Sequence, residues 1–448
     1  MVRLSISAAA VVVVASAASM RHSRPPVAHA PVLDARARAQ AGCDADDAGL
    51  TLPPGFCAGV YASGIASARH MAVASNGDLF VISNPGGRGR GGTPVLRGVW
   101  RLRDTNRDGK ADLIQRVADV TGSGIAIANN ALYAEAVGQT TSIVRFAFKP
   151  RSTDLVGTMD TIVQGIPRNG NHTSREFVIR GANLYLNVGS ATNACQTQDR
   201  QPHVPGVDPC TELETRAGTW EFSATTKNQV FSPAQRFATG IRNGVSLTLN
   251  PRDNELYVVQ HGRDQLADWG MGSEYGSENP AEALFHVTKG KDYGWPYCYY
   301  STEEKRNVTA PEYGGDGKKD DRCRGKEPTV YAFPGHWGPN GALFYTGAQF
   351  PAAYRDGIFV AFHGSWNRTP KQQGYNVTFL PMANGKATGP HVIFADSFSP
   401  EWAQTPSKSP PAGNISHRPS GLAQGIDGSM FVSDDAAGYI YRIVFAGK

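Results

Sequence analysis

Short runs of apolar and polar residues in alternation recur six times along the chain, and each run opens at a small or polar turn residue. Within a run, an apolar residue usually precedes an aromatic one, and mostly β-branched or small residues follow. A turn followed by such an alternation is typical of a β-strand. The six copies occupy residues 77–83, 130–136, 183–189, 255–261, 357–363 and 428–434.

Further apolar segments flank most of these copies on both sides. The first copy, for example, lies between "HMAVAS" and "GVWRLR". Three to four strands per repeat, joined by hairpins, build one blade of a β-propeller. We therefore predict an all-β chain folded as a six-bladed β-propeller. Two stacked β-sandwiches with unrelated strands are the alternative, and the repetition of one pattern argues against them.

The repeats are unevenly spaced. The interval between the fourth and fifth copies, from 255 to 357, is about twice the interval between the first two, from 77 to 130. We interpret the excess as long inserted loops, notably residues 262–281 and 298–335. Long loops in a compact fold are usually functional.

The N-terminus carries a secretory signal pattern. "MVRLSISAAAVVVVASAASM" has one early Arg, an apolar run too short for a typical membrane span, and small residues afterwards. We expect a signal peptide over residues 1 to about 30, cleaved after Ala18 or as late as Ala30, and one propeller domain over residues 31–448. The predicted location is periplasmic or secreted, with no membrane span after cleavage. An uncleaved anchor is the alternative.

Composition supports this picture and removes one class of partner. The chain has 50 Gly and 29 Pro, and only 19% of its residues are charged, which favours short strands joined by turns. Its net charge of +5 is mild and the basic residues are dispersed. We therefore expect no nucleic-acid partner.

Six cysteines in an exported chain predict three disulfides. Spacing does not prove the pairing, since six cysteines allow fifteen arrangements. We expect nearest-neighbour pairing because each couple closes a single Gly- or Asp-rich loop. The expected couples are Cys43 with Cys57, Cys195 with Cys210, and Cys298 with Cys323.

Five stretches, in this order, relate the chain to a known family: "GIRNG", "PAEALFHVTKGKDYGWPYC", "GPNGALFYTG", "FVAFHGSWNR" and "RPSGLA". With them the chain resembles the soluble quinoprotein sugar dehydrogenases, and among these the L-sorbosone dehydrogenase-like proteins. The resemblance runs from "LPPGF" at 52 to "YIYRIVF" at 439. It implies hydride transfer from an aldose or sugar aldehyde to pyrroloquinoline quinone (PQQ), a Ca²⁺ ion on the quinone, and an unidentified external electron acceptor.

His172 in "NHTSREFVIRG" stands just before a strand of the third repeat. The resemblance implies that this histidine is the general base that removes the sugar hydroxyl proton. A neutral imidazole with a pKa near the working pH suits proton abstraction. A surface histidine within an "NHT" glycosylation-like sequence is the alternative.

Arg242 and Asn243 in "GIRNG" correspond to the family pair that holds the quinone. The resemblance places the arginine at the carbonyl that receives the hydride. A fixed guanidinium there would stabilise the developing negative charge. An arginine paired with a surface carboxylate is the alternative.

Other basic residues are expected to hold the carboxylates of PQQ. Arg418 in "HRPSGLA" matches a family arginine with this role, whereas the second arginine usual in the glucose-dehydrogenase branch is Ser420 here. Arg368 in "HGSWNR" is expected to replace the basic residue of the fifth blade. His363 and Trp366 follow the same strand and are expected to line the site.

The segment "SEYGSENPAEALFHVTKGKDYGWP" matches the part of the family that holds Ca²⁺ at the quinone. Glu282 is the best-placed carboxylate, Gly276 and Ser277 are candidate carbonyl ligands, and Tyr293 is expected nearby. One acidic position of the family corresponds to Ala283, which leaves the ligand set open. Hard oxygen ligands suit Ca²⁺, which would polarise the quinone carbonyl.

A second candidate Ca²⁺ site lies in "DTNRDGKAD". Its spacing matches an EF-type loop with Gly109 at the sharp turn, although position twelve is Gln115 and no flanking helices are evident. Such a site would be structural, and a polar hairpin turn is the alternative. The candidate ligands are Asp104, Asn106, Asp108 and Asp112.

Three functions compete at this point. An exported PQQ-dependent dehydrogenase needs basic residues at the blade edges for an anionic cofactor, and the sequence offers them. A Ca²⁺-dependent lactonase-type hydrolase would need inward carboxylates and amides around an axial metal. A non-catalytic binding propeller is the third candidate, because a fold does not fix a function.

Overall fold

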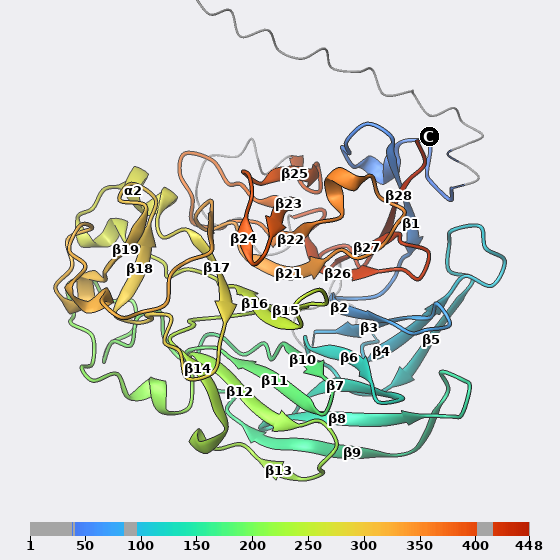
Figure 1. The fold of residues 1–448 in the computed structure, drawn as a ribbon, viewed down its shortest axis with the longest axis horizontal. Helices are drawn as coiled ribbons and strands as arrows, with labels where there is room; N and C mark the ends of the chain where they lie inside the picture. Colours follow the sequence, from blue (N-terminus) through green and yellow to red (C-terminus); the bar gives the residue numbers. More distant parts are fainter. Residues whose placement is uncertain (1–37, 39–40, 85–95, 401–414, 448) are drawn as a thin grey trace, which may run out of the picture.

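Six sheets of four or five strands radiate around a common axis in the computed structural model (Figure 1). The structure describes residue 38 and residues 41–84, 96–400 and 415–447. The innermost strands of neighbouring sheets contact one another around the whole ring. The prediction of a six-bladed β-propeller is confirmed, while the expected signal peptide lies outside the described residues.

Each of the first three blades starts at its innermost strand and continues outward in chain order. Blade 1 contains β2 (Ala68–Val73), β3 (Leu79–Ser83), β4 (Val99–Arg103) and β5 (Leu113–Ala118). Blade 2 contains β6 (Ile125–Ala128), β7 (Ala131–Val137), β8 (Thr141–Phe148) and β9 (Leu155–Ile166), with β13 (Gln229–Val230) added parallel to β9. Blade 3 contains β10 (Phe177–Arg180), β11 (Asn183–Val188), β12 (Gly218–Ser223) and β14 (Arg236–Thr239).

The remaining blades repeat this plan, and the last one closes the ring. Blade 4 contains β15 (Ser246–Asn250), β16 (Glu255–Val259), β17 (Glu282–Val287) and β20 (Tyr331–Phe333). Blade 5 contains β21 (Pro339–Phe344), β22 (Gly357–His363), β23 (Tyr375–Ala383), β24 (Lys386–Ala387) and β25 (Val392–Ala395). Blade 6 contains β26 (Pro419–Gln424), β27 (Met430–Asp434) and β28 (Ile440–Phe445), and its outer strand is β1 (Phe56–Ala62) from the other end of the chain.

The six recurring sequence runs coincide with the second strand of each blade. These strands are β3, β7, β11, β16, β22 and β27. Every residue of β3 and of β27 is buried, because each blade has another blade packed on both of its faces. This burial on two sides explains why the runs are apolar at most positions rather than strictly alternating.

Apolar side chains fill each interface between neighbouring blades. Between blades 2 and 3, for example, Tyr133 and Ile143 pack in one cluster with Leu186 and Trp220, and all four are fully buried. Burying such side chains stabilises the fold by about 1.5–3 kcal/mol each for the aliphatic ones. The stacked interfaces hold the loops at the ends of the strands in fixed positions.

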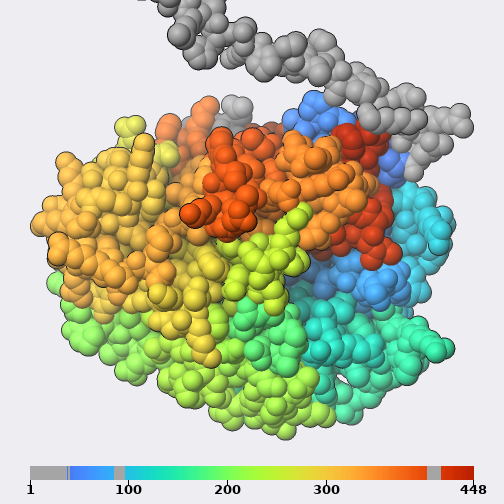
Figure 2. Space-filling view, viewed as in Figure 1, coloured from blue at the N-terminus to red at the C-terminus, as the bar shows by residue number. Residues whose placement is uncertain are grey.

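The long insertions belong to blade 4 and form a lobe at the rim of the ring, on the left in Figures 1 and 2. The loop from β16 to β17 carries the helix α2 (Ser273–Glu278). The loop from β17 to β20 carries the hairpin of β18 (Cys298–Ser301) and β19 (Arg306–Thr309). The described 3-10 helices are η1 (Asp47–Gly49), η3 (Thr211–Glu214), η4 (Pro233–Gln235), η5 (Ala267–Trp269), η6 (Pro311–Tyr313), η7 (Asp321–Cys323) and η8 (Ala352–Tyr354).

Three disulfides join the cysteines in the couples expected from the sequence. They link Cys43 to Cys57, Cys195 to Cys210, and Cys298 to Cys323. The first attaches the N-terminal segment to β1, the second closes the loop after β11, and the third braces the β18–β19 hairpin. Within the described ranges, the helices are all too short or too polar to cross a lipid bilayer.

Candidate active site

The loops that carry the candidate residues meet on one face of the ring. Each innermost strand begins on this face and each second strand ends on it, because the two strands are antiparallel; Ser246 at the start of β15, for instance, pairs with Val259 at the end of β16. We call this side the loop face. Loops on a rigid propeller are where function tends to lie.

His172 lies on the loop face, in the connection from β9 to β10. Its Nδ1 is 2.9 Å from both the carbonyl oxygen and the hydroxyl of Ser190. Because a carbonyl only accepts hydrogen bonds, Nδ1 carries the proton and Nε2 keeps its lone pair. Burial, and then the positive charge of Arg242 and the ring of His261, hold the pKa of His172 well below its usual value. The ring is therefore neutral and basic at Nε2 near neutral pH.

A buried arginine fixes the loop that carries His172. Arg175 donates to the carbonyl oxygens of His172 at 2.8 Å and of Ser174 at 3.0 Å, and also to that of Pro167. Its side chain is fully buried. Arg175 stands three positions after His172 and was not among the residues predicted from the sequence.

Arg242 lies close to His172 and is held by several acceptors at once. Its guanidinium donates to both oxygens of Asn193, to the Gly262 carbonyl at 2.7 Å, and to Asp264 at 3.3 Å. Burial lowers its pKa only to about 10, so it stays charged. Arg242 is thus a fixed positive charge on the loop face, with a buried partner in place of the surface carboxylate considered as an alternative.

Asn243 and His172 converge on Gly189. A Cβ atom at Gly189 would lie 2.6 Å from the Cβ of His172 and 3.0 Å from Oδ1 of Asn243, so only glycine fits there. The Oδ1 atom of Asn243 is buried and has no hydrogen-bond partner among the described residues. A buried polar atom without a partner is a place where a bound ligand would gain a hydrogen bond.

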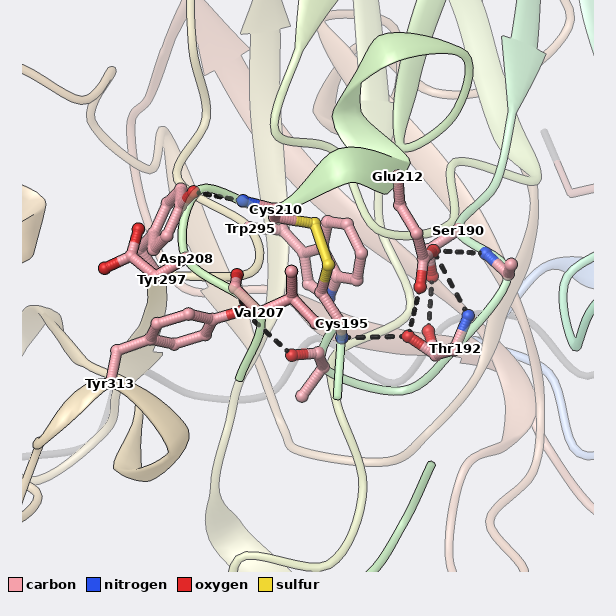
Figure 3. The surroundings of a disulfide bond; sticks show 12 residues. Ser190, Thr192, Cys195, Val207, Asp208, Cys210, Glu212, Trp295, Tyr297 and Tyr313 are labelled. Atoms are coloured by element: carbon pink, nitrogen blue, oxygen red, sulfur yellow. Dashed lines mark hydrogen bonds between the residues drawn. A yellow bond between two sulfur atoms is a disulfide. The ribbon is translucent and has the colours of Figure 1, made fainter. Parts of the chain in front are cut away.

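The loop after β11 holds both His172 and Arg242, and Figure 3 shows what shapes it. Glu212 accepts hydrogen bonds from the backbone N–H groups of Ala191 and Thr192. Trp295 donates from Nε1 to the carbonyl of Asn193 at 3.0 Å. The disulfide between Cys195 and Cys210 closes the same loop. These contacts set the positions of Ser190 and Asn193, which in turn hold the two candidate residues.

Asp264 is the carboxylate at the centre of this arrangement, and it stands in no motif that would predict its role from the sequence. It accepts from Arg200 at 2.9 Å, from Arg242 at 3.3 Å and from Asn367 at 2.9 Å. Burial opposes its ionisation, but the neighbouring positive charges, chiefly Arg242, outweigh burial and lower its pKa to about 2. Asp264 is therefore an anion that links the loops of blades 3, 4 and 5.

A second anion, Asp435, gathers three basic side chains from blades 1, 5 and 6. It accepts from Arg69 at 2.7 Å, from Arg418 at 2.6 Å and from His363 at 3.1 Å. Burial, and then Arg418, lower the pKa of His363 to about 4, so this ring is neutral. Arg418 and His363 were predicted from the sequence to belong to the site, whereas Arg69 and Asp435 were not.

Two expected cofactor residues have different surroundings. Arg368 is buried and donates to the carbonyls of Ser277 at 2.7 Å and Gly335 at 2.8 Å, and its other nitrogen bonds Glu278. These contacts tie the loop after β22 to α2. Trp366 on the same loop is 50% exposed, so its ring remains available to a ligand.

The residues expected around a quinone-bound Ca²⁺ are engaged separately. The carboxylate of Glu282 accepts from the N–H groups of Gly262 at 2.7 Å and Gly338 at 3.2 Å, and burial raises its pKa to about 7. The Gly276 carbonyl is 2.8 Å from His336, and the Ser277 carbonyl accepts from Arg368. Each of these oxygens therefore already has a protein hydrogen-bond partner in this structure.

Tyr293 forms hydrogen bonds within the turn that follows β17. Its hydroxyl donates to the His286 carbonyl at 2.5 Å and accepts from the Thr288 N–H at 2.8 Å. Its ring packs against Phe285. These contacts give Tyr293 a structural role.

The second candidate Ca²⁺ loop connects β4 to β5, and its side chains are used within the turn. Asp104 accepts from the Gly109 N–H at 2.8 Å, Asp108 from the Lys110 N–H at 2.9 Å, and Asp112 from the Thr105 N–H at 2.9 Å. Asn106 accepts from the Asp108 N–H at 3.0 Å. Across the part of the chain that the structure describes, no group of three or more His, Cys, Asp or Glu side chains is arranged to hold a metal ion.

Asp264 and Asp435 each accept hydrogen bonds from two arginines on the loop face. Four guanidinium groups share two ionised carboxylates, and two neutral imidazoles stand beside them. The arginines are Arg69, Arg200, Arg242 and Arg418, and the carboxylates are Asp264 and Asp435. This donor set fits an anionic ligand such as PQQ, which is tri-anionic and needs several convergent basic groups.

The fold is a six-bladed propeller, and its loop face brings arginines from several blades beside the neutral ring of His172. A family model described as TrAA12-like matches residues 50–445. The match spans most of the chain, so the chain belongs to the TrAA12-like family.

Two curated relatives match in part. A PQQ-dependent pyranose dehydrogenase of Coprinopsis cinerea is 27% identical over 231 residues, which is 46% of this chain and 30% of that protein. An uncharacterised protein of Borreliella burgdorferi is 28% identical over 291 residues, which is 62% of this chain and 63% of that protein. The alignments thus span less than two thirds of either relative.

Solved structures share the fold. A Trichoderma reesei enzyme of carbohydrate-active family AA12 superposes with a TM-score of 0.70 at 19% identity, covering 89% of this chain and 98% of that one. The holo PQQ domain of the Coprinopsis cinerea pyranose dehydrogenase gives a TM-score of 0.69 at 21% identity, covering 88% and 97%. At these identities the likeness establishes the propeller architecture.

Proposed function

We propose that this protein is an exported, PQQ-dependent dehydrogenase that oxidises an aldose or a sugar aldehyde. The observation that carries the proposal is the neutral His172, with its free Nε2, beside the fixed charge of Arg242. The arginines gathered at Asp264 and Asp435 on the same face favour an anionic cofactor over the carboxylate-ringed metal of a hydrolase. PQQ-dependent relatives within the same fold support the choice of cofactor.

His172 takes the proton of the reacting sugar hydroxyl at Nε2. Its Nδ1–H stays bonded to Ser190, which fixes the tautomer and the direction of the lone pair. Bound PQQ supplies the oxidising power by accepting the hydride. Arg242 stabilises negative charge that develops beside it, and Arg69 and Arg418 hold carboxylate groups. Asn243 Oδ1 accepts a hydrogen bond from the bound ligand.

A calcium ion on the quinone remains an expectation of the resemblance. Glu282, Gly276 and Ser277 are engaged with backbone, histidine and arginine partners in this structure. The proposed chemistry therefore rests on the arginines and His172. Three disulfides favour an oxidising compartment, so we place the protein in the periplasm or outside the cell.

Reconstitution of the apoprotein with PQQ tests this proposal. We expect PQQ to stay with the protein through dialysis and its absorption spectrum to change to the reduced form when an aldose from a panel is added. Parallel samples with Ca²⁺ and with a chelator determine whether the metal contributes. A protein that does not retain PQQ under either condition would show the proposal to be wrong.

A further inference from the structure

A pocket of about 300 Å³ opens on the loop face at the outer strands of blade 5. Its walls come from the segment before β21, the loop from β22 to β23, and the loop after β25. These three segments lie on the loop face, because β21 and β23 begin there and β25, antiparallel to β23, ends there. Pockets that hold small molecules have volumes of about 300–1,000 Å³. The pocket is therefore large enough for a small ligand.

One wall of the pocket is apolar and consists mainly of Ile393 and Trp337. Ile393 on β25 is 47% exposed, and Trp337, two residues before β21, packs in the cluster between blades 4 and 5. The Nε1 atom of Trp337 donates to Oε1 of Gln373 at 3.3 Å, which holds Gln373 against the same wall. A ligand in the pocket would therefore take part of the Ile393 side chain out of water, which favours binding.

Asn376 on β23 lines the pocket and is buried, with only 4% of its surface exposed. Its neighbours Tyr375 and Val377 belong to the apolar cluster between blades 5 and 6, so Asn376 points to the opposite face of the sheet, where Trp337 lies. The Oδ1 atom of Asn376 is buried and has no hydrogen-bond partner among the described residues. A buried polar atom of this kind is expected to bond a ligand or an ordered water. The pocket therefore contains a binding group that the protein itself leaves unpaired.

The pocket is polar without being cationic. Its remaining polar side chains are Gln373, Asp396, Ser397 and Ser399. Asp396 carries the only charge among the described lining residues, so an anion such as PQQ is disfavoured here. Hydroxyl groups both donate and accept, and they therefore suit the amide of Asn376 and the carboxylate of Asp396. A neutral ring that carries hydroxyls and C–H groups, such as a sugar, matches these polar groups and the apolar wall together.

A single loop joins this pocket to the candidate active site. The loop from β22 to β23 is closed on itself, since the Ser365 N–H donates to the Gln373 carbonyl and the Gln373 N–H donates to Oγ of Ser365, both at 2.8 Å. Between these two residues the loop carries Asn367, which donates to Asp264 at 2.9 Å. The same closed loop therefore lines the pocket at one end and bonds the central carboxylate of the candidate active site.

We propose that this pocket is a carbohydrate-binding site that takes one neutral sugar unit. The proposal deepens the function proposed above and rests on it for the choice of a sugar among neutral ligands with hydroxyls. The unit is either part of the sugar chain whose end is oxidised at His172 or part of a separate chain that keeps the enzyme at its substrate. In both cases Asn376 accepts a hydrogen bond from a sugar hydroxyl at Oδ1, and C–H groups of the ring cover Ile393.

Two variants of the pocket, each with a matched control, test the proposal. Asn376→Leu removes the unpaired amide, whereas Thr378→Val removes a similarly buried and unpaired hydroxyl on the same face of β23 that does not line the pocket. Ile393→Ser removes the apolar wall, whereas Val392→Ser changes a neighbour on β25 that is 45% exposed and also does not line it. Thermal melts identify any variant that does not fold, and each wall of the pocket is tested independently of the other.

Calorimetric titration of the apoprotein with glucose, cellotetraose and maltotetraose measures binding without requiring turnover. Wild type should bind at least one of these probes. Asn376→Leu and Ile393→Ser should each bind it about fivefold more weakly, which is the effect of one lost hydrogen bond or of lost apolar burial. Thr378→Val and Val392→Ser should bind it as wild type does.

Equal binding by wild type and both pocket variants, or no binding of any probe by wild type, would overturn the proposal. Kinetics of the PQQ-loaded protein distinguish the two sources of the sugar unit. A higher KM of Asn376→Leu for a tetrasaccharide, with an unchanged KM for glucose, assigns the site to the oxidised chain, whereas unchanged KM values with weaker titration assign it to a separate chain. A wild-type protein that binds a probe in the pocket but whose PQQ no aldose reduces would instead refute the proposed function.

Discussion

Replacing His172 by alanine should abolish base catalysis and leave the rest of the loop face in place. The imidazole bonds only Ser190 among the contacts described above, whereas Arg242 and Asn243 are held independently of it. The hydroxyl of Ser190 also bonds the Thr192 carbonyl at 2.7 Å, so it keeps a partner in the variant. The carbonyl of Ser190 loses its donor, so the variant should lose about 1–3 kcal/mol of stability, the usual cost of a buried acceptor left unpaired.

The expected kinetic loss is much larger. General-base catalysis contributes about 10²- to 10⁴-fold, equivalent to about 3–5 kcal/mol on the barrier. Because burial, Arg242 and His261 lower the pKa of His172, the wild-type rate should hold from neutral pH down past 6.5 and fall only at lower pH. The alanine variant should lack this acid limb altogether.

Single-turnover reduction of protein-bound PQQ by aldose, followed by stopped-flow absorption from pH 8 to pH 4, measures both quantities. PQQ affinity of the two proteins, measured by equilibrium dialysis, is the control and should agree within a few-fold. A variant that keeps the wild-type rate, or its acid limb, would exclude His172 as the base.

Three further predictions concern the surroundings of His172. Arg242→Ala should weaken PQQ binding and slow its reduction by a barrier increase of about 3 kcal/mol, as loss of a charge-stabilising donor does; unchanged dialysis and stopped-flow results would count against this role. Replacing Cys195 and Cys210 by serine should lower the free energy of unfolding, measured by calorimetry, by about 2–4 kcal/mol and should weaken PQQ binding. An unaltered melting temperature would contradict this. Burial lowers the pKa of His261 to about 3 and that of His363 to about 4. As the pH falls below 6.5, the unfolded chain therefore takes up protons before the folded protein does, and the apoprotein loses stability. In thermal melts, His363→Gln should lose less stability over this pH range than wild type.

The recurring strand pattern was enough to predict the fold. Each blade packs against a neighbour on both faces, so the second strand of every blade needs a similar set of apolar and aromatic residues. The sequence pattern of this strand therefore recurs six times. The closing strand β1 and the added strand β13 do not have this recurring sequence pattern. Their pairing depends on chain segments far apart in sequence, which a local pattern does not contain.

From the sequence, residues of the candidate site could be predicted only where they lie in a short motif that resembles one of the family. His172, Arg242 and Arg418 were expected in the site from the family resemblance of their motifs, and the structure places them all on the loop face. Asp264 and Asp435 were not predicted, because each is identified only by its contacts with arginines on other blades. Such partners become neighbours only when the ring closes.

In the long insertion of blade 4, the sequence predicted the contacts of individual residues least well. Gly276 and Ser277 were assigned to Ca²⁺ by alignment across a long loop, but in the structure their carbonyls bond His336 and Arg368. Arg368 was expected to hold the cofactor, and in this structure its guanidinium ties its loop to α2. The conformation of an irregular loop depends on many tertiary contacts, so residue correspondence within it is weakly constrained by sequence.

The most direct test of the central claim is a balance of electrons and atoms. Protein loaded with one equivalent of PQQ is mixed with one equivalent of an accepted aldose, and the reduced cofactor and the sugar product are both quantified by absorption and mass spectrometry. The account predicts one reduced PQQ for each sugar that has lost two hydrogens. Bound PQQ with unchanged sugar, or a sugar product that has gained water without any reduction of PQQ, would contradict it.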